Sequence, residues 1–460
     1  MAVSALFSLG VKTMTASYAQ LQTTGHNIAN AHVEGYSRQT TELATSRGQF
    51  SGSGFFGKGV DVVTVTRAHN EFVAREADAA KTVATMDAAR LTQLQSLEQV
   101  FRTGESGLGH AAGQFFNSMV DLASRPGDSS TRQVVLARAE EVANRFAHAA
   151  QQLDTLQRSA TADLTSAVTQ VNALGGNIAE VNGKIAALLG LGQPANDLLD
   201  ERDRLVSKLN GIIQVSTIPA EDGSLSVFIS GDQRLVLGTQ AVKLQLLADE
   251  TDPSRAGVGF TENGRDRQID NHTLIGGTIA GLLRFQNDDL VAARNLVGRL
   301  AVAVAGASNE QQMLGLNLYP PAGSVPSEPF FRVGDPRSVP SRSNTRDASG
   351  NYLASVALTV TDASKVQASD YSLRADPAAG PGSYLITRLS DGVVRGIVSG
   401  DVVDGFRVDV GTPAPDISDR FLLQAVSRGA NGMRLLLDDP RDVAAASPLV
   451  APRCLRPPAP

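Results

Sequence analysis

A group of acidic residues in one short segment is the strongest candidate for chemistry in this sequence. Asp197, Asp200, Glu201 and Asp203 occur within seven residues. Carboxylates in such numbers bind calcium or serve as the acid and base of glycoside hydrolysis. The same residues fall in the first turns of a predicted helix over 196–209, where negative charge complements the helix dipole. Asp200 can also pair with Arg204 one turn later. We therefore predict a structural role for these acids.

Other motifs give weaker signals for chemistry. The run from Gly52 to Gly57 matches G-x-G-x-x-G, but a β-prone run follows it, so no helix N-terminus is in place to bind phosphate. The spacings of His26, His32 and Glu34 do not place metal ligands on one helix face. The loop at Asp347 lacks the alternating acids of a calcium-binding loop. The sequence thus predicts no catalytic residue, no cofactor and no metal.

Composition limits the function further. Charged residues make up 19% of the chain, the net charge is −6, and aromatic residues reach only 5%, which argues against a nucleic-acid interface. The single cysteine, Cys454, excludes a disulfide within the chain. The apolar run 300–307 is too short to span a bilayer. The N-terminus lacks the charged and apolar regions of a cleaved signal peptide. We expect no nucleic-acid or membrane partner.

The N-terminus reads as an amphipathic helix. Phe7, Met14, Leu21 and Ile28 recur every seven residues. The same stripe is widened by Val3, Leu6, Val11 and Tyr18. A helix with such a face requires a partner that buries it. The helix ends before Gly35, and the β-prone runs 39–45 and 60–66 then predict a long hairpin.

The rest of the chain predicts an α+β multidomain protein. Two apolar heptad lines run through a long helix, from Phe146 to Leu188 and from Leu164 to Ile185, as in a bundle or coiled coil. Gly175-Gly176 is a weak point in this helix. We predict the following segments: an N-terminal helix and hairpin (1–69), a long-helix bundle domain (70–212), a small inserted β unit (213–276), a returning helix of the bundle (277–318), a separate all-β outer domain (330–440) and an aberrant Pro-rich tail (441–460).

Several of these segments resemble a known family. Asn27-Ile-Ala-Asn30 followed by Gly35-Tyr36-Ser37-Arg38-Gln39 is similar to the N-terminal signature of flagellar rod, hook and hook-associated proteins. Residues 31–34 depart from that signature. Three further stretches resemble the hook-associated protein 1 branch of the family, namely 196–203, 276–283 and 439–447.

The resemblance implies a structural subunit of the bacterial flagellum. Such subunits form a homo-oligomeric ring that joins the hook protein to the next hook-associated junction protein. They leave the cell through the flagellar type III apparatus, without a cleaved signal peptide and with the help of an export chaperone, and are extracellular in the flagellum. We expect the assembly residues to be those of the stripe and the signature, namely Phe7, Met14, Leu21, Ile28, Asn27, Asn30, Gly35, Tyr36, Arg38 and Gln39.

The C-terminus departs from the family. There the partner of the stripe is a C-terminal helix, whereas residues 448–460 contain five prolines, which exclude a helix. We expect a frameshift or premature end near Ser447, weak binding to the export chaperone and unstable assembly. Two alternatives remain: another axial flagellar protein, such as a hook or rod subunit, and a secreted adhesin or effector that binds a host ligand. A hydrolase in the β domain is the weakest interpretation.

Overall fold

The computed structural model describes residues 2–51, 54–262, 264–321 and 325–446. The chain forms two compact units, each built from separate stretches of sequence. Unit 1 comprises Met1–Arg90, Asp163–Leu247 and Val258–Leu283, and unit 2 comprises Leu91–Ala162, Ala248–Gly257 and Arg284–Pro460. The proline-rich tail, with its predicted frameshift or early end, lies from residue 447 onward outside the described residues.

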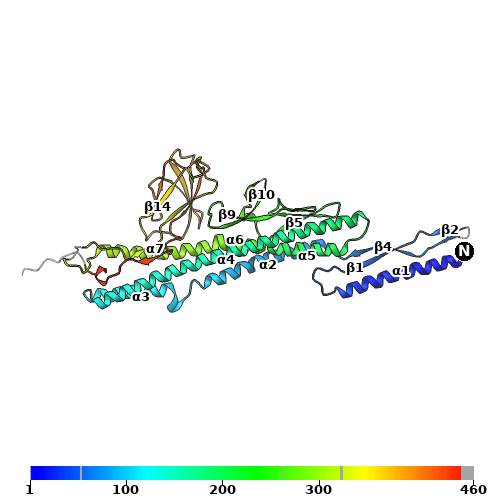
Figure 1. Cartoon of the computed structure of the whole chain (residues 1–460), viewed down its shortest axis with the longest axis horizontal. Coiled ribbons are helices and arrows are strands. Elements are labelled where there is room, and N and C mark those ends of the chain that lie inside the picture. The colour runs from blue at the N-terminus through cyan, green and yellow to red at the C-terminus, as the bar shows by residue number, and fades with distance from the viewer. Residues whose placement is uncertain (1, 52–53, 263, 322–324, 447–460) are drawn as a thin grey trace, which may run out of the picture. The chain divides into compact units, whose positions relative to one another are not determined.

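Unit 1 contains long helices and three groups of strands. Its helical parts come from α1 (Ala2–Ala29), α2 (Glu71–Glu98), α4 (Ser129–Gly190), α5 (Asn196–Ile212) and α6 (Gly277–Arg284) (Figure 1). The predicted hairpin is confirmed: β1 (Gln39–Thr45) pairs antiparallel with β4 (Val60–Arg67), with a bulge after Glu42. Between them, β2 (Gln49–Ser51) pairs with β3 (Gly54–Phe56), so the Gly52–Gly57 run leads into a strand, with residues 52 and 53 outside the described part.

The strands between residues 215 and 268 form two small sheets. One has the order β5-β6-β7-β8 and the other the order β11-β10-β9. Their bounds are β5 (Val215–Pro219), β6 (Leu225–Ile229), β7 (Gln233–Leu237), β8 (Gln240–Ala241), β9 (Leu244–Ala248), β10 (Ala256–Glu262) and β11 (Arg265–Gln268).

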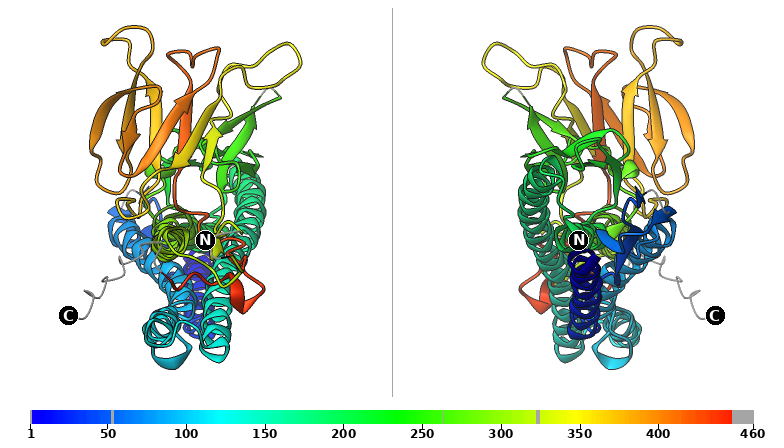
Figure 2. Two further views of the ribbon diagram at one scale, coloured as in Figure 1. Left: turned by 90° about the vertical axis from the view of Figure 1, so that its left-hand side faces the viewer. Right: turned by 90° about the vertical axis from the view of Figure 1, so that its right-hand side faces the viewer.

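Unit 2 combines helices with a β domain. Its helical parts are the end of α2, α3 (Leu108–Ser124), the first part of α4 and α7 (Leu290–Leu314), which follows a π-helical turn at Phe285–Asp289. A five-stranded sheet has the order β13-β20-β15-β16-β17, and a three-stranded sheet the order β14-β19-β18. These strands gather in one β domain, yellow to orange in Figure 2. The bounds are β12 (Phe331–Arg332), β13 (Arg337–Pro340), β14 (Val356–Val360), β15 (Tyr371–Ala375), β16 (Ser383–Arg388), β17 (Val394–Val398), β18 (Val402–Val403), β19 (Phe406–Val410), β20 (Arg420–Gln424) and β21 (Arg434–Leu435).

The long helix α4 forms for the reasons that the sequence indicates. Asp128 caps its first turn, because one carboxylate oxygen accepts the Ser130 N–H at 2.9 Å and the other accepts the Thr131 hydroxyl at 3.0 Å. Residues of both heptad lines are buried, among them Phe146, Leu153, Ala160, Leu164, Val171, Ile178 and Ile185. The glycine pair does not break the helix: a Cβ on Gly175 would be in ordinary contact with Leu235 and Val236 of β7. Packing against this sheet offsets the low helix propensity of glycine.

These observations confirm the predicted fold class, an α+β protein with long packed helices, small β sheets and a β domain. The finer division into six segments stays a prediction.

The helical run Gly277–Leu314 is apolar and long enough to cross a membrane, with a mean hydropathy of 1.4 in its most apolar window. Val297, Ala301 and Ala305 of this run are nonetheless buried in the core of unit 2, beside Phe146 and Leu153 of α4. Such burial accounts for the apolar composition, because a core helix satisfies the same criterion as a membrane span.

Candidate assembly surface

Helix α1 has two faces of different character. One face carries Lys12, Ala16 and Thr23 and lies against the β1–β4 hairpin (Figure 1). Lys12 Nζ donates to Ser46 Oγ at 2.7 Å and to the Asp61 carboxylate at 2.8 Å. The hydrogen bonds that Asp61 accepts from Lys12 and from Ser46 Oγ lower its pKa. The hydroxyls of Thr23 and Thr41 lie 2.9 Å apart, and Ala16 is 3% exposed. The hairpin therefore covers this face of the helix.

The predicted apolar stripe lies on the opposite face. Phe7 is 76% exposed, Met14 69%, Leu21 71% and Ile28 72%. At about 100° per residue, the stripe points roughly half a turn away from the positions that face the hairpin. Leu6, Val11 and Tyr18 are also more than half exposed, and the Val3 side chain lies outside the described part. A continuous apolar surface of this kind is typical of an interaction site.

Asn27 anchors the end of α1 to the start of β1. Its amide nitrogen donates to the Gln39 carbonyl at 2.9 Å, and its amide oxygen accepts the Gln39 N–H at 2.8 Å. The same oxygen accepts the Tyr36 hydroxyl at 2.7 Å. The Asn30 amide donates to the His26 carbonyl at 3.0 Å, one turn back along the helix. The two asparagines of the signature thus fix the turn between helix and strand.

Gly35 and Tyr36 shape that turn. Gly35 has φ +80°, and a Cβ there would lie 3.1 Å from Cβ of Arg204 on α5, so glycine is required both for its backbone angle and for space. The Tyr36 ring packs edge-on against His26, with centroids 5.6 Å apart. Burial raises the pKa of Tyr36, and Asp197 and Asp200 add to the shift. The Arg38 side chain is exposed, while its carbonyl accepts the Ala68 N–H at 2.8 Å.

The acids of α5 bind this N-terminal segment. Asp200 accepts the Ser37 N–H at 2.9 Å and pairs with Arg67 at 2.9 Å. Arg67 also pairs with Asp203 at 2.6 Å. The prediction that Asp200 pairs with Arg204 is wrong, because Arg67 of the hairpin takes that place. A helix-dipole role alone also understates these carboxylates, since they contact residues more than 130 positions earlier in the chain.

The structure brings the predicted site residues together in two places. Phe7, Met14, Leu21 and Ile28 form the exposed stripe, and Asn27, Asn30, Gly35, Tyr36 and Gln39 form the turn beside α5. Sequence reasoning did not identify Arg67 and Asn196 as members of the site. The sequence shows only an arginine at the end of a predicted strand and an asparagine at the start of a predicted helix. Nothing in a single sequence indicates which residues these two side chains contact.

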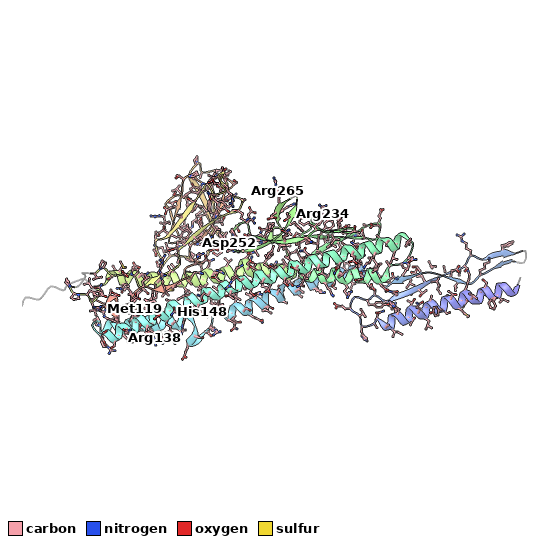
Figure 3. All side chains as sticks on the ribbon, in the orientation of Figure 1. Met119, Arg138, His148, Arg234, Asp252 and Arg265 are labelled. Atoms are coloured by element: carbon pink, nitrogen blue, oxygen red, sulfur yellow. The ribbon has the colours of Figure 1, made fainter. Side chains whose placement is uncertain are left out.

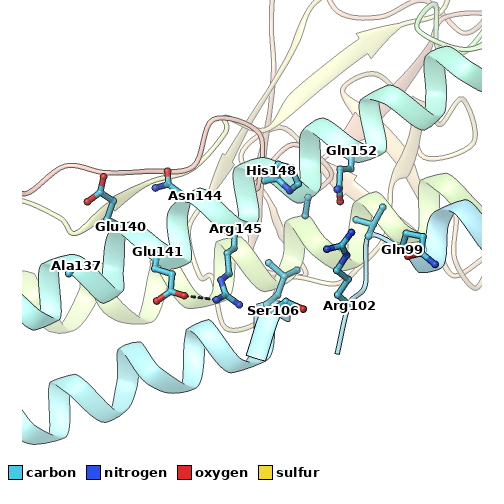
Figure 4. A pocket seen from close by; sticks show the side chains of 13 residues that line it. Gln99, Arg102, Ser106, Ala137, Glu140, Glu141, Asn144, Arg145, His148 and Gln152 are labelled. Atoms are coloured by element: carbon cyan, nitrogen blue, oxygen red, sulfur yellow. Dashed lines mark hydrogen bonds and ion pairs between the residues drawn. The ribbon is translucent and has the colours of Figure 1, made fainter. Parts of the chain in front are cut away.

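Two hollows in the described residues are lined by charged side chains that are engaged in structural contacts. A cavity of about 520 Å³ in unit 2 is lined by side chains of α4 and the segment before α3 (Figure 4); Arg138 and His148 mark this part of α4 in Figure 3. Arg145 donates to the Glu105 carbonyl at 2.7 Å and pairs with Glu141 at 2.5 Å. Hydrogen bonds from Arg138 and Arg145 lower the pKa of Glu141. A carboxylate held in its ionised form is poorly suited to general acid catalysis.

A second cavity of about 560 Å³ in unit 2 lies beside a network of ion pairs. Arg255 pairs with Asp252 at 3.1 Å and lies 3.5 Å from Asp370, and Arg294 pairs with Asp154 at 2.7 Å. Among the described residues, no group of His, Cys, Asp and Glu side chains has the arrangement of a metal site. The charged side chains that line these two cavities form ion pairs within unit 2.

Comparison with known proteins identifies the class. Residues 94–331 match the family model described as the flagellar hook-associated protein FlgK helical domain, and residues 342–425 match that of the flagellar hook-associated protein 1, D2-like domain. The chain is a member of the hook-associated proteins of the bacterial flagellum.

Individual relatives narrow the class to one family. Flagellar hook-associated protein 1 of Escherichia coli K12 is 31% identical over 453 residues, 97% of this chain and 80% of the relative. The protein of the same name from Bacillus subtilis is 25% identical over 66% of this chain and 57% of the relative. A solved structure of the flagellar hook junction protein FlgK from Burkholderia pseudomallei has a TM-score of 0.73 at 28% identity, covering 81% of this chain and 66% of that one. The chain belongs to the flagellar hook-associated protein 1 family.

Proposed function

We propose that this chain is a structural subunit that joins the hook to the filament of the bacterial flagellum and has no catalytic activity. The proposal rests on the family and on the name of the solved relative, a hook junction protein. In this view the protein leaves the cell without a cleaved signal peptide and acts in the extracellular flagellum. Its partners are further copies in a ring, the hook protein on one side and the next junction protein on the other.

The observation that carries the mechanism is the division of α1 into a covered and an exposed face. The hairpin satisfies the polar face through Lys12 and Asn27, which leaves the stripe free to bind other helices. Burying seven large apolar side chains contributes roughly 10 kcal/mol before the costs of association. That magnitude is of the same order as the free-energy cost of association, roughly 4–15 kcal/mol, so burial of the stripe can offset a large part of that cost. The stripe is thus proposed to pack against helices of neighbouring subunits.

A complementation experiment tests this function. A strain that lacks its own junction subunit receives the full chain, and filaments are counted by electron microscopy. Filaments with the wild-type chain would support the junction function and would overturn the expectation, drawn from residues 448–460, that assembly is unstable. Combining Met14→Ser and Leu21→Ser should abolish these filaments. Gln20→Ser is the matched control, because Gln20 is an exposed polar residue of the same helix. Normal filaments with the double variant would contradict an assembly role for the stripe, and a secreted chain that never restores filaments would contradict the junction function.

A further inference from the structure

The first two turns of α5 contact the N-terminal segment through polar groups only a few residues apart. Asp200 is 7% exposed, and both of its carboxylate oxygens are used: one accepts the Ser37 N–H at 2.9 Å and the other accepts Arg67 at 2.9 Å. Arg67 bridges from there to Asp203 at 2.6 Å. Arg67 is itself mostly buried, with 14% of its side chain exposed. Two acids and one arginine therefore form an ionic group in which Asp200 and Arg67 are mostly buried and Asp203 is 30% exposed.

Hydrogen bonds on either side extend this group to both strands of the hairpin. Asp197 accepts the side-chain amide of Gln39 in β1 at 2.7 Å and lies 3.4 Å from the His26 ring. The Asn196 amide donates to the Val65 carbonyl in β4 at 2.6 Å. One short stretch of α5 thus binds the end of α1, the turn after it and both strands.

We propose that Asn196, Asp197, Asp200 and Asp203, which we call the α5 anchor, position the N-terminal segment and thereby set the direction in which α1 presents its apolar stripe. The inference rests on the proposed function, because the stripe needs a fixed direction only if it meets neighbouring subunits. Apolar contacts tolerate sliding, whereas a carboxylate that accepts two donors at 2.9 Å fixes position and orientation together. The anchor residues are positioning residues, and the stripe makes the contacts.

The contacts of the anchor depend on charge. Substitutions that remove a charge but keep the shape of the side chain can therefore test these contacts without changing the apolar packing. Removing either partner of a mostly buried ion pair leaves the other charge unpaired, and this costs more than the pair contributes. Asp200→Asn preserves the shape of the side chain and an oxygen that can accept the Ser37 N–H, but removes the charge that Arg67 requires. Arg67→Gln removes the other member. Glu201→Gln is the matched control, since Glu201 carries the same charge on the same helix and is exposed.

The test uses the full chain carrying Cys454→Ser and two spin labels, one at Ser17→Cys on α1 and one at Lys208→Cys on α5, both exposed positions. Pulsed electron paramagnetic resonance gives the distance distribution between the labels, and hydrogen exchange reports on the amides of residues 36–39. We expect a single narrow distance in the parent and in Glu201→Gln. Asp200→Asn and Arg67→Gln should broaden it and accelerate exchange of the Ser37 amide by roughly tenfold or more. Circular dichroism should show unchanged helix content, and Arg67→Lys should recover part of the narrow distribution.

The outcomes separate this inference from the proposed function. A narrow distance in both Asp200→Asn and Arg67→Gln would show that the anchor does not position the segment. A broad distance combined with normal filaments in the complementation assay would show that a fixed direction of α1 is dispensable, which also overturns the inference while leaving the junction function intact. We expect broad distance distributions and a loss of filaments in Asp200→Asn and Arg67→Gln, and normal filaments in Glu201→Gln. A wild-type chain that never forms filaments would instead reject the proposed function itself.

Discussion

Replacement of Asp370 by asparagine is expected to stabilise the β domain of unit 2 at neutral pH. Asp370 is 2% exposed and directly precedes β15. Burial raises the pKa of Asp370 to about 6, against the opposing effects of Arg255 and Asn295. Asp252 lies close enough to add to the shift, and Arg294 opposes it. The carboxylate is therefore ionised at pH 7 in an environment that favours its neutral form.

Proton binding to Asp370 is linked to folding, and this linkage sets the sign and size of the change in folding free energy. The pKa of Asp370 is about 6 in the folded chain, above the ordinary aspartate value of 3.8, so folding favours the protonated form. The stabilisation from this group is complete below about pH 4 and is lost as pH rises through 6. At 1.36 kcal/mol per pKa unit, the loss above pH 6 is about 3 kcal/mol. Asp370→Asn, which cannot ionise, should recover up to that amount at pH 7 and close to nothing at pH 4.

Hydrogen exchange of the β15 amides measures this difference, because β15 is paired on both sides by β16 and β20. At pH 7 the variant amides should exchange about one hundred times more slowly than those of the parent, if they exchange through opening of the domain. Asp335→Asn is the control, since Asp335 is 84% exposed and its loss should change stability by less than about 0.5 kcal/mol. Equal or faster exchange in Asp370→Asn at pH 7 would refute the reasoning.

Three further substitutions test individual contacts. Gly35→Ala forces a side chain into a left-handed backbone and against α5, and should cost about 1–2 kcal/mol, seen as faster exchange of the turn amides. Arg132→Met removes a guanidinium that donates to the carbonyls of Pro126 and Val443 from a residue that is 1% exposed. We expect the free energy of unfolding of unit 2 in urea to fall by about 3 kcal/mol. A fall of less than about 1 kcal/mol would contradict this expectation. Gly298→Ala places a methyl group on the Val426 carbonyl and should lower the unfolding midpoint of unit 2, whereas an unchanged midpoint would show that the contact is loose.

The sequence predicted features whose cause is local. Heptad spacing predicted α4, because a helix needs one face to bury and Phe146, Leu153 and Ile178 supply it. The alternation in 39–45 and 60–66 predicted the hairpin, since strand pairing follows side-chain periodicity. The stripe of α1 was visible for the same reason.

Contacts between distant segments could not be predicted in this way. Asp200 was paired with Arg204 because helix spacing suggests the partner one turn away, whereas Arg67, 133 positions earlier, occupies the site. Gly175 was read as a weak point because propensity scales omit the sheet that packs on it. Residues 442–444 were placed in an aberrant tail, yet Gln312 binds the Asp442 carbonyl at 2.7 Å and the Ala444 N–H at 2.9 Å. In each case the sequence omits a partner that only folding brings near.

Cysteine cross-linking in isolated flagella tests the central claim most directly. The full chain carrying Cys454→Ser receives either Leu21→Cys, on the exposed stripe, or Thr23→Cys, on the face covered by the hairpin. After secretion and assembly, a short bifunctional thiol reagent is applied and the products are separated by mass. We predict that chains carrying Leu21→Cys yield covalent products that contain two subunits, and that chains carrying Thr23→Cys do not. A Leu21→Cys chain that stays monomeric and freely reactive with a thiol label in assembled flagella would contradict the claim.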